Sequence, residues 1–174
     1  MQKKAIIEIL HSNHQDFFEL LDTMDLDAFE YSKNGKWSPG QHLAHIVSTL
    51  SPVRMAMGLP LFIIAWRVGK ANRPSRTYEE LVARYREKLS LGGKAPARFV
   101  PPAISLKDKQ RLIQQSTRLL GSLISRIERR QEHELDAYIL PHPLLGKITL
   151  REMLFFTAYH VEHHRQLILR DVRE

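Results

Sequence analysis

The chain contains no cysteine among its 174 residues. This absence excludes disulfides, thiolate metal ligands and a cysteine nucleophile. Any metal ion would have to be held by histidine, aspartate, glutamate or main-chain oxygen. Any thiol chemistry would need a thiol that a small molecule brings in.

Long apolar runs are also missing. The longest uncharged apolar stretch near the middle of the chain, Met55 to Trp66, has 12 residues and is interrupted by Gly58 and Pro60. A stretch of this length is too short to span a bilayer. The first residues show no basic segment followed by an apolar run, which would be typical of a secretory signal. We therefore expect a cytoplasmic protein without a membrane partner.

The charge is moderately basic, with 26 Lys and Arg against 19 Asp and Glu and a formal net charge of +7. A basic protein can bind nucleic acid or an anionic substrate. Here the basic residues are dispersed along the chain, and no zinc-finger or RNA-recognition signature accompanies them. We interpret them as solvated helix faces and loops and do not expect a nucleic-acid partner.

The hydrophobic pattern is helical almost throughout. In the first segment Ile7, Leu10, His14, Phe17 and Leu21 follow a spacing of three or four residues, which predicts one face of a long amphipathic helix. A polar loop is expected over 31–36. At this length and with 43% hydrophobic residues, we expect a single domain over 1–174 with a substantial core.

Capping signals predict where the later helices begin. Ser38-Pro39 with Gln41 suits the start of a second helix, which should reach at least Leu50 and end or kink at Pro52. Thr77 with Glu80 predicts a shorter helix that stops near 91–93. A third long helix should begin near Ser105, and Thr149 with Glu152 predicts a last helix that continues to about Arg170.

These elements predict an all-α fold. We expect a four-helix bundle with one additional short helix in the connection between the second and third long helices, and no strands. The stretch 59–76 has no clear type. Its apolar run 61–66 is interpreted as core, with contact to a homodimer partner as the alternative.

A histidine-rich cluster, Tyr159 to Gln166, lies near the C-terminus. Two histidines four residues apart project from one helix face, but chance alone supplies about half of one such pair in this composition. On a helical wheel Met153, Phe156 and Leu167 share the face of His160 and His164, whereas Glu162 lies opposite. Two inward imidazoles are either hydrogen-bonded core residues or metal ligands, and both interpretations remain open here.

The second helix offers a third ligand. It contains no formally charged residue from Trp37 to Val53, so neither face looks fully solvated. His45 lies on its polar side and is the natural partner of the two C-terminal histidines, since three protein ligands leave a catalytic metal an open position. His42 is a weaker candidate that we expect to be structural or exposed.

Trp37-Ser38-Pro39 followed by His45, together with His160-x-x-x-His164 ahead of Arg165 and Gln166, resembles the DinB/YfiT-like superfamily. The segment from His142 to Met153 resembles the entry to the last helix in its DinB_2 branch. The resemblance implies a four-helix bundle that binds a divalent metal, commonly zinc or nickel, through His45, His160 and His164. Members with known activity are mostly thiol-dependent transferases and isomerases, and the family's DNA-damage name records induction rather than DNA chemistry.

The resulting hypothesis is a metal-dependent enzyme whose metal lowers the pKa of a water or a small thiol, for transfer to or hydrolysis of a small molecule. The alternative is a non-catalytic metal-binding or nucleic-acid-binding helical module. Besides His42, the sequence leaves three other histidines without a firm role. His14 is interpreted as a buried, hydrogen-bonded residue with a supporting role at the site as the alternative, His142 as part of a rigid loop, and His163 as lying at the edge of the stripe and outside the ligand set.

Overall fold

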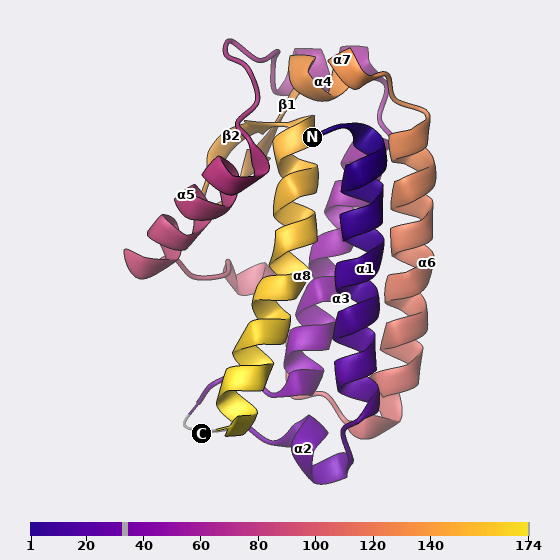
Figure 1. The fold of residues 1–174 in the computed structure, drawn as a ribbon, viewed down its shortest axis with the longest axis vertical. Helices are drawn as coiled ribbons and strands as arrows, with labels where there is room; N and C mark the ends of the chain where they lie inside the picture. The colour runs from indigo at the N-terminus through magenta and orange to yellow at the C-terminus, as the bar shows by residue number, and fades with distance from the viewer. Residues whose placement is uncertain (33–34, 174) are drawn as a thin grey trace.

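The computed structural model describes residues 1–32 and 35–173, so positions 33 and 34 of the predicted loop lie outside the described residues. Four long helices lie side by side along the molecule (Figure 1). These are α1 (Lys3–Asp22), α3 (Pro39–Met57), α6 (Lys109–Glu128) and α8 (Leu150–Arg173). The predicted all-α helical bundle is confirmed.

Hydrogen bonds between the helix ends fix the directions of the four helices. Arg151 at the start of α8 donates to the carbonyl of Met1 at 2.8 Å, so α1 and α8 run the same way. Arg126 donates to the carbonyl of Arg54 at 3.0 Å, which brings the last turns of α3 and α6 together. The helices α3 and α6 therefore also run in the same direction. Two consecutive long helices that are parallel need a long crossover between them. Residues 58–108 supply it.

That crossover contains more structure than the single short helix we expected. It holds α4 (Leu61–Arg67) and α5 (Tyr78–Ser90), followed by the 3-10 turns η1 (Ala97–Phe99) and η2 (Leu106–Asp108). The run 61–66 is only partly core. Ile64 is buried, whereas Phe62 and Trp66 are 74% and 79% exposed, because α4 turns only one face to the protein.

Two short helices close the ends of the bundle: α2 (Leu26–Glu30) lies at one end and α7 (Glu132–Ala137) at the other (Figure 1). An antiparallel hairpin of β1 (Ile139–His142) and β2 (Gly146–Thr149) leads into α8. The expectation of no strands is wrong at this point. Strands of four residues are too short to show a clear alternation of apolar and polar residues.

The predicted helix starts at Ser38, Thr77 and Thr149 are all present. Ser38 Oγ accepts from the backbone N–H of Gln41, and the Gln41 side chain accepts from the N–H of Ser38. Thr149 and Glu152 form the same reciprocal pair at the start of α8. Pro52, however, does not end α3, because Val53 and Met57 beyond it are buried and the packing holds the last turn.

Apolar side chains from the long helices fill the space between them. Leu10, Phe17, Leu43, Ile46 and Phe155 are each at most 2% exposed. Among the described residues no single helix is long and apolar enough to cross a membrane; α3 and α4 reach that length and composition only as a pair bent by 107°. The core positions α3 and α8 side by side, which determines the site described next.

Candidate metal centre

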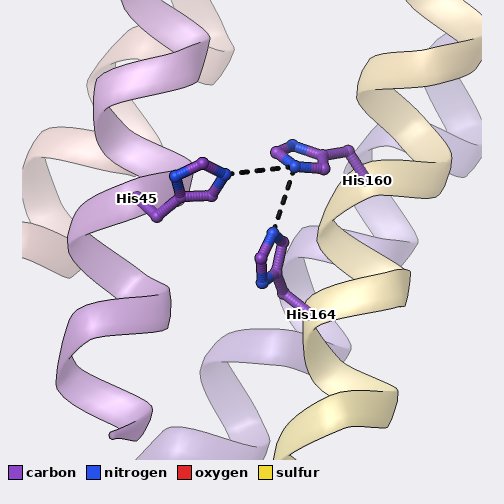
Figure 2. A group of neighbouring side chains, drawn as sticks. All are labelled: His45, His160 and His164. Carbon is purple, nitrogen blue, oxygen red and sulfur yellow. Dashed lines mark hydrogen bonds between the residues drawn. The ribbon is translucent and has the colours of Figure 1, made fainter. Parts of the chain in front are cut away.

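Three imidazoles from two helices point toward one another in the bundle (Figure 2). His45 comes from the middle of α3, and His160 and His164 come from successive turns of α8. The Nε2 atom of His160 lies 3.2 Å from Nε2 of His45 and 3.1 Å from Nε2 of His164. Within the described ranges, one ligand atom from each of the three lies within 4.8 Å of the others.

The local sequence explains this convergence. The spacing of four residues aligns His160 and His164 on the face of α8 that the sequence predicts to be apolar. That face packs inward, so His160 and His164 are each only 5% exposed, and His45 on the neighbouring helix α3 is 3% exposed. The structure therefore brings together the three histidines that the sequence analysis selected.

The outer nitrogen of His45 is held by the main chain. Its Nδ1 lies 2.7 Å from the carbonyl oxygen of Phe99 in η1. A carbonyl only accepts, so Nδ1 must carry the proton and donate it. In the neutral ring Nε2 is then a bare lone pair that faces His160 and His164.

The outer nitrogen of His164 meets another histidine. His42 Nδ1 lies 2.7 Å from His164 Nδ1, which means that one nitrogen donates and the other accepts. We expected His42 to be structural or exposed; it is 4% exposed, so only the structural alternative agrees with the structure. It lies one turn before His45 on α3 and supports a member of the group from outside.

The three inner nitrogens cannot all be satisfied by hydrogen bonds among themselves. Nε2 of His45 offers a lone pair. If Nε2 of His160 carries a proton, that single N–H cannot point at both His45 and His164. If the proton sits on His164 instead, the lone pairs of His45 and His160 face each other at 3.2 Å. Buried polar atoms are normally paired, and converging imidazole lone pairs are the donor set that divalent metals accept.

The spacing also suits a single ion. Zinc–imidazole bonds of about 2.0–2.1 Å place ligand nitrogens about 3.3 Å apart in a tetrahedron and about 2.9 Å apart in an octahedron. The two closest contacts, at 3.1 and 3.2 Å, fall between these values. The chemistry of the three residues and the two short contacts at His160 thus fit a divalent metal, with the third pair of nitrogens, from His45 and His164, also within 4.8 Å.

Burial also keeps these imidazoles neutral. It lowers the pKa of His160 and His164 well below the usual 6.5. Burial lowers the pKa of His45 as well, although its bond to Phe99 acts in the opposite direction. Since a metal binds the neutral ring, the site is ready for a ligand near neutral pH.

A cavity of about 570 Å³ opens next to the three histidines. Trp37 forms one wall, with its ring stacked on His164 at 6.0 Å between centroids and 7° between planes. Phe156 stacks on His160 at 4.7 Å, and Tyr85 meets His160 edge-on. The cavity is large enough for a small molecule and is lined largely by aromatic and apolar side chains.

The structure places the other candidate residues outside the group of three. His14 is buried in α1, where Nδ1 bonds to the carbonyl of Leu10 at 2.7 Å, and it does not line the cavity. His163 lines the cavity but is not one of the three. Glu162 bonds to Arg165 at 2.7 Å on the outer side of α8. His142 lines the cavity from the hairpin.

Comparison with known proteins identifies the family of this chain. The family model of the DinB superfamily matches residues 9–168. The chain belongs to the DinB superfamily. All three histidines of this DinB-superfamily chain lie within the matched residues. Comparisons with curated proteins and with solved structures give no match.

Some contributors to the site have no sequence signal. The carbonyl of Phe99 acts through the main chain, so its residue type carries no information. Tyr85 lies on α5, whose cavity-facing side cannot be identified before the packing of α5 on α8 is known. Trp37 is part of the motif that carries the family resemblance, but its stacking on His164 appears only in three dimensions.

Proposed function

We propose that this DinB-superfamily chain binds a divalent metal ion, zinc or nickel, through the Nε2 atoms of His45, His160 and His164. The observation that supports the proposal is the convergence of three buried imidazole nitrogens that cannot pair fully with one another. Three imidazoles also suit other first-row metals, and the donor set alone favours none of them strongly.

We further propose that the protein is an enzyme that acts on a small molecule in the cavity. A metal with an open position lowers the pKa of a bound water or thiol. The chain's own residues orient and enclose the site: Phe99 and His42 hold the outer nitrogens of two imidazoles, and Trp37 covers the face of His164.

A low-molecular-weight thiol is the co-substrate that we favour. The chain has no cysteine, so the nucleophilic sulfur would come from outside. In the reaction a thiol releases its proton to solvent and its sulfur forms a bond to an electrophilic carbon. Either the carbon–halogen bond breaks and a halide leaves, or an epoxide C–O bond breaks and the ring oxygen takes up a proton. Hydrolysis by water at the same position is the second possibility for this site.

The test is turnover of a halogenated or epoxide substrate by protein loaded with zinc or nickel, with and without a small thiol. We expect thiol-dependent product that disappears after chelation and returns when metal is added back. Absence of any metal-dependent acceleration, with thiol or with water, would contradict an enzymatic role. A steep salt-dependent affinity for DNA or RNA without metal would instead support a nucleic-acid-binding module.

A further inference from the structure

His142 is fixed in one tautomer by the hairpin that precedes α8. Its Nδ1 lies 3.2 Å from the backbone nitrogen of Leu144 and 3.1 Å from that of Leu145, and both N–H groups donate to it. A nitrogen that accepts two hydrogen bonds carries no proton. The proton of the neutral ring must therefore be on Nε2.

This Nε2–H group has no partner within the part of the chain that the structure describes. His142 as a whole is 9% exposed, and it is one of the residues that line the cavity. Since Nδ1 is turned to the backbone of the hairpin, the free donor is on the side of the ring away from that turn. A nearly buried donor without a partner favours a ligand that supplies an acceptor.

The ring lies close to the metal centre but does not belong to it. His142 packs against Phe156 at 4.2 Å between centroids, and Phe156 in turn stacks on His160. Tyr85 meets His142 edge-on from α5. The donor of His142 is thus separated from the three histidines by one aromatic ring, a distance that a small molecule in the cavity can span.

The ring is neutral as well as oriented. Burial lowers the pKa of His142 to about 4. The two N–H groups that point at Nδ1 further oppose protonation there. Near neutral pH the side chain acts as a neutral hydrogen-bond donor rather than as a cation or an acid.

We propose that His142 is a positioning residue that donates a hydrogen bond from Nε2–H to a carbonyl or carboxylate oxygen of the molecule bound in the cavity. The inference rests on the proposed function only in taking this cavity as the substrate site. It assigns the substrate a feature that the three histidines do not, namely an acceptor oxygen next to the ring of Phe156.

Two substitutions separate the positioning role from the structural one. In His142→Asn the side-chain oxygen can occupy the place of Nδ1 and accept from the turn, but nothing reaches the position of Nε2. In His142→Gln the amide reaches the position of Nε2 and can donate, but the turn loses its acceptor. If His142 were purely structural, the Gln variant would show both the lower melting temperature and the weaker ligand binding of the two.

The probes are acetophenone, which has a carbonyl oxygen, and α-methylstyrene, in which a methylene group replaces that oxygen. Binding is followed by NMR of the full chain labelled with ¹⁵N-histidine, both metal-loaded and chelator-treated. We expect a protonated Nε2 on His142 whose signal shifts with acetophenone and not with α-methylstyrene. His142→Asn should weaken acetophenone binding about tenfold with an unchanged melting temperature, whereas His142→Gln should keep the affinity and melt lower.

Three results would overturn the inference: a proton on Nδ1 of His142, no shift of its signal at the solubility limit of acetophenone, or equal responses to the two probes. The chelator-treated arm separates this outcome from failure of the proposed function. If the protein fails to bind metal, the NMR response of His142 to the two probes can still be measured. If His142 does not respond to the probes, metal binding by the three histidines is unaffected.

Discussion

His42 Nδ1 and His164 Nδ1 lie 2.7 Å apart in the interior of the bundle. When a metal occupies Nε2 of His164, the proton of that ring is on Nδ1 and must be donated to His42. His42 then accepts as a neutral ring, which agrees with a pKa that burial, aided by the neighbouring His45, lowers to about 3. The pair therefore orients one ligand and fixes its tautomer.

From this pair we expect His42→Ala to weaken metal binding about 10- to 100-fold while the three proposed ligands remain in place. The affinity is measured by competition with a chromophoric chelator. Gln41→Ala, which removes a side chain of the same helix that bonds to Ser38 and Pro101 instead, serves as the control. Equal affinities of the His42 variant and wild type would show that the pair does not orient the ligand.

Removal of one of the three histidines should abolish stoichiometric metal binding. We expect His160→Ala to purify with less than a tenth of the wild-type metal content by elemental analysis, because two ligands hold an ion far more weakly than three. His163→Ala is the matched control, since His163 is on the same helix and lines the same cavity but lies outside the group. Unchanged metal content in His160→Ala would exclude the assignment.

His14 should make the metal-free protein less stable in acid. Burial lowers its pKa from 6.5 to about 4, so between these values the unfolded chain binds a proton that the folded chain does not. Stability then falls as the pH falls through this window, by about 1.4 kcal/mol per pH unit for this group.

The free energy of unfolding should therefore fall by roughly 3 kcal/mol less in His14→Leu than in wild type between pH 7 and pH 4. Urea unfolding with a chelator present gives the measurement. The unpaired, buried Nε2 of His14 is removed at the same time. His11→Leu changes an exposed histidine of the same helix and is the control. Parallel profiles for wild type and His14→Leu would refute the role of His14.

Glu152 connects the start of α8 to the crossover and should be important for stability. Its side chain is fully buried, pairs with Arg73 at 2.8 Å and Arg76 at 3.1 Å, and accepts from the N–H of Thr149. Burial alone would raise its pKa, but the hydrogen bonds from Arg73 and the backbone outweigh this effect and lower it to about 2. The carboxylate thus stabilises the fold above about pH 4.5, and this contribution is lost as the pH falls toward 2.

We expect Glu152→Gln to destabilise the protein by about 2–3 kcal/mol at pH 7, less than for a fully buried pair because both arginines are partly solvated. Thermal unfolding gives the measurement, with the exposed Glu79→Gln as the control, for which the change should stay within about 0.5 kcal/mol. A melting temperature equal to wild type would contradict this prediction, because it would mean that water replaces the carboxylate as the hydrogen-bond partner of the two arginines at no cost in stability.

Local signals in the sequence predict much of this fold. The reciprocal caps of Ser38 with Gln41 and of Thr149 with Glu152 depend on residues three apart, so the sequence alone locates these helix starts. The spacing of His160 and His164 on an apolar face likewise depends on one helix. These predictions are correct because the tertiary packing favours the same local structure as the sequence.

Features that depend on packing between distant segments could not be predicted. The bond from His45 to the carbonyl of Phe99 joins positions 54 residues apart, and the one between His42 and His164 joins positions 122 apart. The hairpin that holds His142 has strands too short for a periodic signal. The exposure of Phe62 and Trp66 follows from how α4 lies on the bundle, which the composition of an apolar run does not specify.

The central claim is that three histidines bind one metal ion. The most direct measurement is a crystal structure of the protein loaded with zinc, with the ion located from its anomalous signal. We predict one strong peak with the Nε2 atoms of His45, His160 and His164 within about 2.0–2.2 Å of it. A structure without a peak among these three nitrogens, or with zinc held by His163 or His142 instead, would contradict the claim.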